Sequence, residues 1–204
     1  MAGQTAPYSR AVEAIRERLA TGQVAPGANM VVGDIAQDLD LSPTPVREAL
    51  VRLAGEGLIE DRRGKGYFAW PLGAADISEL YQTHQAYLRI ALETWAAHGA
   101  LSASSGLAAS SEPPSCAAVF DQIVRSSGNR ILWEDYRHLT ERMARVRLVE
   151  SVVLRNVEAE SAGLRQALDG SDLEALKTAI DAYHARRLQC SGVVAGAIAD
   201  GNYR

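Results

Sequence analysis

The chain has 204 residues, of which 47% are apolar and 23% are charged, and its formal net charge is −4 at pH 7. This length and apolar content suit a globular protein with one large domain or two small ones. The longest apolar stretches, such as "GVVAGAIA", are far shorter than the ~20 residues that cross a bilayer. The N-terminus has no apolar core behind a basic start, so it does not predict a secretory signal. We expect a cytoplasmic protein without a membrane anchor.

The first seventy residues predict three helices followed by a hairpin. Apolar residues recur at helical spacing from Ser9 to about Ala20, in a short stretch at 32–40, and again from Ser42 or Thr44 to residue 56. The stretches "GLIEDRR" and "GYFAW" then predict two short strands around a basic tip flanked by glycines.

Beyond Pro71 the pattern is helical to the end of the chain. The stretch "GALSASSGLAASSEPPS" interrupts it and predicts a surface loop or a degenerate helix. We expect helices at about 77–98, 116–126, 129–157, 160–169 and 172–199, with "SSGN" and "DGSD" supplying breaks and caps. No CxxC spacing occurs, so Cys116 and Cys190 are predicted to be reduced packing residues.

The acidic net charge taken alone argues against a nucleic-acid partner, because phosphate binding relies on clustered Lys and Arg. The distribution of the charges matters more than their sum. Basic residues gather in the third predicted helix and in the hairpin that follows, and they are Arg47, Arg52, Arg62, Arg63 and Lys65. A locally basic face on an acidic body is therefore possible.

The stretch "LSPTPVREAL" has the features of a helix that reads DNA. Ser42 or Thr44 can cap this helix, and proline is tolerated in its first turn because the N–H groups there have no intrahelical partner. Arg47 points away from the apolar face, where its guanidinium group could bind a guanine edge or a phosphate. Arg52 is a second candidate for such a contact.

The hairpin tip "RRGKG" is suited to a second contact with DNA. Arg62, Arg63 and Lys65 supply positive charge, and glycines such as Gly66 let the backbone approach DNA closely. Three helices and a hairpin in this order predict a helix-turn-helix with a wing. In such a motif, the second helix of the helix-turn-helix enters the major groove. The alternative is a solvated amphipathic helix followed by an ordinary hairpin.

The segment "VAPGANMVVGDIAQDLDLSPTPVREALVRLAGEGLIEDRRGKGYFA" closely resembles the winged-helix domain of GntR-family transcriptional regulators. The resemblance implies a homodimer that binds a double-stranded DNA operator. Pro43 stands where the family usually has Arg, and Gly33 stands where many members have Arg. Both positions often contact DNA in the family, so contacts here should depend more on Thr44, Arg47 and the wing.

The helical half resembles, more loosely, the FadR-type effector domain of the same family, which is called the FCD domain. This resemblance implies a bundle that dimerises the protein and binds a small organic acid, often beside a metal held by one Asp and three His. Those four positions fall on Cys116, Phe120, Ser161 and His184. A transition-metal site usually needs three or four protein ligands, and only His184 matches, so we predict no metal and no other cofactor.

An effector site is still possible without a metal. His84, Arg147 and His184 are expected to face the interior of the bundle, where they could hold a carboxylate, and Asn129 in "SSGNRIL" completes the candidate set. The alternative is that each histidine is a hydrogen-bonded core residue and that Arg147 extends to solvent.

The predicted fold class is mainly α, with a winged helix-turn-helix over residues 1–72 and an all-α effector and dimerisation bundle over residues 73–204. We expect a DNA-binding transcriptional regulator, most simply a repressor, whose operator binding responds to a carboxylate effector. One alternative is a winged helix used as a protein-interaction module. The other is an enzyme using His84 and His184, but the chain has no nucleophile motif, phosphate loop or paired ligand spacing, so we predict that it is not an enzyme.

Overall fold

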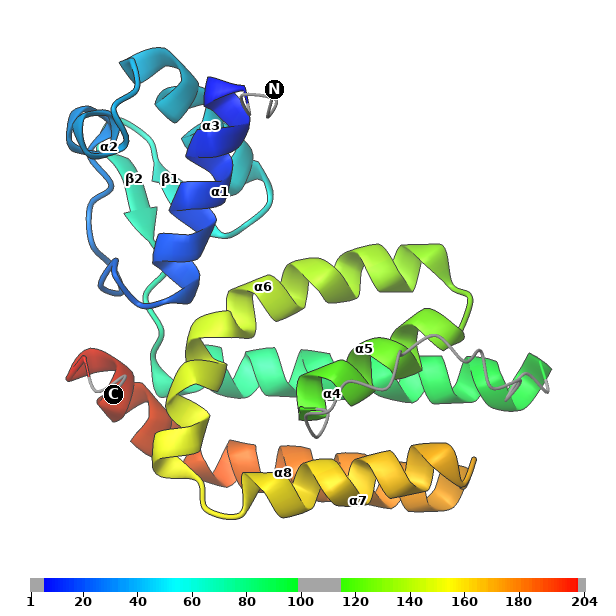
Figure 1. Ribbon diagram of the computed structural model, residues 1–204. Coiled ribbons are helices and arrows are strands. Elements are labelled where there is room, and N and C mark those ends of the chain that lie inside the picture. Colours follow the sequence, from blue (N-terminus) through cyan, green and yellow to red (C-terminus); the bar gives the residue numbers. More distant parts are fainter. Residues whose placement is uncertain (1–5, 99–114, 202–204) are drawn as a thin grey trace.

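The computed structural model describes residues 6–98 and 115–201. Figure 1 shows a smaller N-terminal domain above a larger helical one. The N-terminal domain contains α1 (Pro7–Ala20), α2 (Val32–Leu39), α3 (Pro43–Gly55), β1 (Ile59–Arg62) and β2 (Gly66–Ala69). The helical domain contains α4 (Ala74–His98), α5 (Cys116–Ser126), α6 (Arg130–Val153), α7 (Val157–Asp169) and α8 (Leu173–Ala199).

The N-terminal domain is built around the packing of α1 on α3. Apolar residues spaced three or four apart lie on one face of a helix. The buried ones on these two helices are Ala11, Val12 and Ile15 of α1 and Val46, Ala49, Leu50 and Leu53 of α3. A tight turn joins α2 to α3, and in it Asp40 adopts the left-handed conformation with φ of 51°.

The two strands form an antiparallel hairpin in which Ile59 pairs with Ala69 and Arg62 pairs with Gly66. A short bridge between Asn29 and Phe68 adds the segment before α2 to the edge of this hairpin. The wing is therefore anchored on the body of the domain at its base, while its tip remains exposed.

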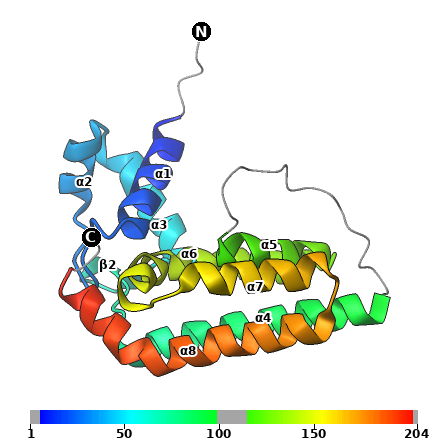
Figure 2. The ribbon, with the colours of Figure 1, turned by 60° about the horizontal axis from the view of Figure 1, so that its bottom comes forward.

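In the helical domain, the long helices α4 and α8 lie side by side along the length of the bundle (Figure 2). Helices α5, α6 and α7 pack against this pair and close a separate hydrophobic core. Two predicted caps are formed, because Asn129 accepts a hydrogen bond from the Leu132 N–H at 3.1 Å and Asp172 accepts one from the Ala175 N–H at 3.0 Å.

The predicted fold class is confirmed: an N-terminal helix-turn-helix with a two-stranded wing precedes an all-helical domain. Several helix ends differ from the sequence expectation. Helix α6 ends at Val153 rather than near residue 157, and α7 begins at Val157 rather than at Glu160, because Asn156 adopts a left-handed φ of 60° between them. No helix in residues 6–98 and 115–201 is long and apolar enough to cross a membrane. The predicted loop at 99–115 lies almost entirely outside the described residues.

Candidate functional site

The start of α3 is exposed, as a helix that enters a DNA groove requires. Ser42 is the N-cap residue by its backbone conformation, with φ of −71° and ψ of 157°, but its side chain forms no capping hydrogen bond. Pro43 occupies the first helical position, and Thr44 is exposed beside it. The predicted side-chain cap by Ser42 or Thr44 is therefore wrong, and both residues are exposed.

Thr44, Arg47 and Val51 form one outward stripe along α3, which we call the reading face. Residues three and four apart lie on the same side of a helix, and all three side chains are exposed. Arg47 forms no ion pair or hydrogen bond with another described residue. Sequence reasoning missed Val51, which is 56% exposed; the available signal was an apolar residue one helical turn after Arg47 and off the buried face.

Arg52 does not belong to the reading face, which corrects its prediction as a second groove contact. It lies five positions after Arg47, and at 3.6 residues per turn this places it about 140° around the helix axis. Its Nε donates to Glu56 at 2.7 Å and its Nη1 donates to the Tyr8 hydroxyl at 3.3 Å. Hydrogen bonding to Glu56 raises the pKa of Arg52 above its usual value. Arg52 thus connects α3 to α1.

The wing tip carries two of its three predicted cations outward. Arg62 instead pairs with Glu60 at 2.6 Å and lies over the Phe68 ring at 4.3 Å from its centroid, so it stabilises the hairpin itself. Arg63 and Lys65 are exposed and form no ion pair with a residue that the structure describes.

The turn at the wing tip depends on glycine. The backbone N–H of Lys65 donates to the Arg62 carbonyl oxygen at 2.7 Å, and Gly64 and Gly66 have φ of 73° and 98°. Positive φ is unfavourable for residues with a Cβ, so glycine at these positions lets the tip project. A groove lined in part by Val51, Ile59 and Arg62 joins the reading face to the first wing strand.

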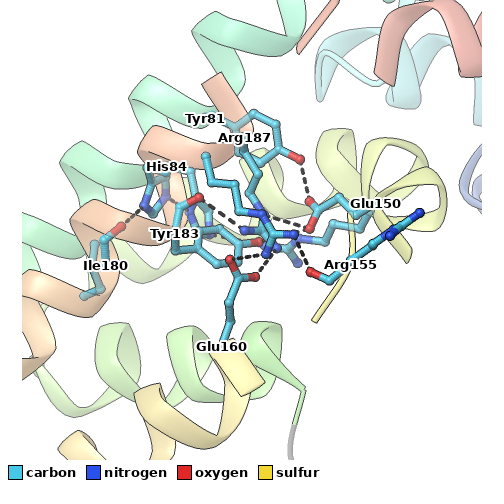
Figure 3. Close-up of polar contacts among 11 residues, drawn as sticks. Tyr81, His84, Glu150, Arg155, Glu160, Ile180, Tyr183 and Arg187 are labelled. Carbon is cyan, nitrogen blue, oxygen red and sulfur yellow. Dashed lines mark hydrogen bonds and ion pairs between the residues drawn. The ribbon is translucent and has the colours of Figure 1, made fainter. Parts of the chain in front are cut away.

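In the helical domain, three of the four predicted effector residues lie together on adjacent helices. His84 Nδ1 is 2.8 Å from His184 Nε2, and His84 Nε2 is 3.2 Å from Arg147 Nη2. His184 Nδ1 is 2.6 Å from the Ile180 carbonyl oxygen, which accepts only, so His184 must donate from Nδ1 and accept at Nε2. It follows that His84 donates from Nδ1 and accepts from Arg147 at Nε2. Figure 3 labels His84 and Ile180 among the helices of the bundle.

Both histidines are fully buried and held in the neutral form. Burial is the largest cause of the low pKa of His184, which falls to about 4, and of that of His84, which falls well below its usual value. The ring of Phe120 lies edge-on to His84 at 5.2 Å between centroids, and Tyr136 is 5.4 Å from His84. The outermost residue of this histidine cluster is Arg147. Its side chain is only partly buried, but its Nε atom is buried and forms no hydrogen bond within the described part of the chain.

Asn129 is not brought to this cluster. It is exposed and its side-chain oxygen is used to cap α6. It precedes Arg147 by 18 positions on the same helix, a separation of about 27 Å at 1.5 Å per residue. The residue predicted for the effector site is thus a helix cap.

A buried ion-pair network lies next to the histidines, and sequence reasoning missed it (Figure 3). Arg187 is 0% exposed; its Nε lies 2.8 Å from Glu150 and its Nη2 lies 3.0 Å from Glu160. Its guanidinium group lies over the Tyr183 ring at 3.3 Å from the centroid, and Tyr81 donates a hydrogen bond to Glu150. The sequence did contain a sign that Arg187 is buried, because it is three positions after the inward-facing His184 and so lies on the same face of the helix.

The positions that correspond to the family's metal ligands do not suit a transition metal. Burial raises the pKa of the Cys116 thiol to about 11, so it is not a thiolate at neutral pH. Phe120 supplies only a ring, the Ser161 hydroxyl donates to the Glu158 carbonyl oxygen at 2.8 Å, and both ring nitrogens of His184 are engaged. No three His, Cys, Asp or Glu side chains gather to hold a metal within the described part of the chain.

The sequence of the N-terminal domain matches that of a known family. The model for bacterial regulatory proteins of the gntR family matches residues 7–68, from the start of α1 to the second wing strand. Over residues 7–68, the chain is therefore similar in sequence to the GntR family. The reading face and the wing tip described above both lie within the matched residues.

Two relatives are regulators by name. An HTH-type transcriptional regulator from Agrobacterium vitis is 39% identical over 89 residues, which cover 44% of this chain and 49% of that protein. Another from Streptomyces ambofaciens is 30% identical over 127 residues, covering 62% of this chain and 49% of that protein. The matches therefore span about half the length of these relatives.

The fold of the whole chain also recurs among solved structures. A transcriptional regulator GntR from Rhodococcus sp. RHA1 superposes with a TM-score of 0.65, covering 95% of this chain and 99% of that one. The two sequences are 20% identical, so this likeness concerns the fold alone, in which a winged helix precedes a helical domain.

Proposed function

We propose that this protein is a sequence-specific DNA-binding transcriptional regulator. The observation that carries the proposal is Arg47, which is exposed on the reading face of a GntR-like winged helix and has no ion-pair or hydrogen-bond partner among residues 6–98 and 115–201. A guanidinium group binds a guanine edge or a phosphate best when no carboxylate competes for it. Arg63 and Lys65 at the wing tip add two cations for the DNA backbone.

The reading face also suits direct recognition of bases. Arg47 can bind the O6 and N7 atoms of guanine with two hydrogen bonds, and Val51 can contact the methyl group of thymine. Thr44 offers a hydroxyl group near the start of the helix, where backbone N–H groups favour a phosphate. With Pro43 and Gly33 in place of arginines, recognition rests on fewer side chains than in the family.

The proposal includes a homodimer formed through the helical domain. Half-sites in the major groove are spaced by about one helical turn, ~34 Å, so two winged helices must be held at a matching distance. The resemblance of the helical half to FadR-type domains supports this arrangement. Exposed apolar side chains on its helices, Ile90, Leu148, Val152 and Val193, provide surface for such an interface.

The proposal further includes a small organic acid as effector, bound without a metal at the outer end of the histidine cluster. Two buried polar atoms there, Arg147 Nε and the Tyr136 hydroxyl oxygen, form no hydrogen bond of normal geometry with a described residue. A carboxylate could accept a hydrogen bond from each. The Asp121 carboxyl group lies close to the Tyr136 hydroxyl, and burial raises the pKa of this carboxyl group. The effector would change operator binding only by favouring one dimer geometry over another, most simply by releasing a repressor from its operator.

The test of this function is to sequence the genomic DNA fragments that the purified protein retains, followed by affinity measurements at several salt concentrations. Retention of a common inverted repeat, with affinity that falls steeply as salt rises, is the expected result. Absence of DNA binding would contradict the proposal and favour a winged helix that binds protein.

A further inference from the structure

A cavity lies between the two domains, away from the histidine cluster. Its volume is about 240 Å³. The N-terminal domain contributes Arg16, Leu19 and Leu58, Trp70 follows the wing, and the helical domain contributes Leu80 and Arg142. Its walls are mainly apolar, as in small-molecule sites, which usually enclose about 300–1,000 Å³. The smaller volume here suits a ligand with one ring.

Three polar atoms of side chains that line this cavity are buried and form no hydrogen bond with any residue that the structure describes: Trp70 Nε1, Arg16 Nε and Glu141 Oε2. Leaving a buried polar atom without a partner costs about 1–3 kcal/mol. The remaining guanidinium nitrogens of Arg16 are engaged with Glu56 and, at 2.8 Å, with Glu141. Two of the three unpartnered atoms are therefore donors that an acceptor inside the cavity would satisfy.

The charge around the cavity also favours an anion. Three arginines and two carboxylates line it, and both carboxylates have partners within the protein. Asp76 accepts a hydrogen bond from the Gly73 N–H at 2.8 Å, and Glu141 pairs with Arg16. Arg142 lies over the Trp70 ring at 5.4 Å from its centroid, and it forms no ion pair with a residue in 6–98 or 115–201.

We propose that this cavity binds a small aromatic carboxylate. The carboxylate accepts hydrogen bonds from Trp70 Nε1 and Arg16 Nε and lies near the guanidinium group of Arg142. The ring packs among the leucine side chains of both domains. Glu141 Oε2 is left for a hydroxyl substituent or a water molecule.

A ligand here would connect the two domains directly. In the described residues, the domains are otherwise joined at this side by the ion pair of Arg16 with Glu141 and by hydrogen bonds from Arg145 to the carbonyl oxygens of Gly22 and Val24. Because the ligand contacts both walls, it would favour the domain orientation in which the cavity is closed. This site differs from the one proposed beside Arg147, and its existence does not depend on DNA binding.

The experiment follows the indole N–H signal of Trp70 in ¹⁵N-labelled full-length protein by NMR, with Trp70→Phe used to assign it. Benzoate is the probe, and neutral benzamide is the matched control. Benzoate should shift this signal in a saturable way, while benzamide at the same concentrations should not. Arg142→Gln should weaken benzoate binding about threefold, as expected for a partly exposed charge pair, and the exposed Arg130→Gln on the same helix should leave it unchanged.

The proposal is overturned if millimolar benzoate leaves the Trp70 signal in place, or if benzamide shifts it equally. It is also overturned if Arg142→Gln binds benzoate as tightly as the unaltered protein. Arg147→Gln separates the two sites: the Trp70 shift should persist in this variant, and its loss would mean that benzoate acts from the histidine cluster. DNA retention by the same samples is measured separately. Failure of the DNA-binding proposal is therefore distinguished from failure of the proposal that the cavity binds a carboxylate.

Discussion

Nδ1 of His84 donates a hydrogen bond to Nε2 of His184 across 2.8 Å, in a part of the bundle where both side chains are fully buried. The donor–acceptor order is set at one end by the Ile180 carbonyl oxygen and at the other by Arg147. Every ring nitrogen of the pair therefore has a partner, and neither ring can gain a proton without breaking a hydrogen bond. The pair contributes stability only while both rings remain neutral.

This pair predicts that the protein loses stability in mild acid. The native pKa of His184 is about 4, whereas an unfolded histidine has a pKa of about 6.5. Between these values the unfolded state binds more protons than the native state, so the free energy of unfolding falls as the pH drops from about 6.5 to 4. The loss from His184 is about 3 kcal/mol over this window, and His84 adds to it. Urea unfolding at a series of pH values measures it.

The variant His184→Gln should flatten this pH dependence, even if it is less stable overall. The exposed His138→Gln on α6 is the matched control and should keep the slope of the unaltered protein. A slope that is the same in all three proteins would show that the buried pair does not titrate in this way.

The neighbouring arginines Arg186 and Arg187 are predicted to differ sharply in their contribution to stability. Arg187→Met removes the cation that pairs with Glu150, which is buried, and with Glu160, which is half-buried. Removing one partner of a buried ion pair lowers the free energy of unfolding by about 3–5 kcal/mol. Arg186 pairs with Glu160 from a half-exposed position, so Arg186→Met should cost less than about 1 kcal/mol. Chemical denaturation compares the two, and equal losses would refute the structural role given to Arg187.

The wing cations predict a change in the salt dependence of DNA binding. Each phosphate contact contributes about 0.9 to the slope of log affinity against log salt concentration. Arg63→Gln and Lys65→Gln should each reduce that slope by about one. Arg62→Gln should leave it nearly unchanged, because Arg62 is engaged with Glu60 and Phe68. Titrations at several salt concentrations distinguish these outcomes, and a larger effect at Arg62 than at Arg63 would contradict the assignment of the wing tip.

The sequence predicted the order of elements because apolar periodicity and turn residues are local signals. It also predicted the inward faces of His84 and His184, since each lies at helical spacing from buried neighbours. It could not predict the partners of individual arginines. Arg52 and Arg62 look as basic as Arg47 and Lys65 in the sequence, but Glu56, Tyr8 and Glu60 engage them in the fold.

The misassignment of Asn129 has a similar cause. A polar residue before a long helix can cap that helix or line a cavity, and only the fold decides between the two. The cavity between the domains was also beyond prediction, because Trp70 and Arg142 are far apart in the sequence and meet only after the domains pack. Local structure was therefore more accessible from the sequence than contacts between distant segments.

The most direct test of the account compares Arg47→Ala with Arg52→Ala in binding to a retained DNA fragment at one fixed salt concentration. Both side chains are exposed cations on α3, but only Arg47 lies on the reading face. The account predicts that Arg47→Ala weakens binding by about fivefold to 150-fold, the range for one base contact of about 1–3 kcal/mol, and that Arg52→Ala has a much smaller effect. Full affinity in Arg47→Ala, or an equal loss in both variants, would contradict it.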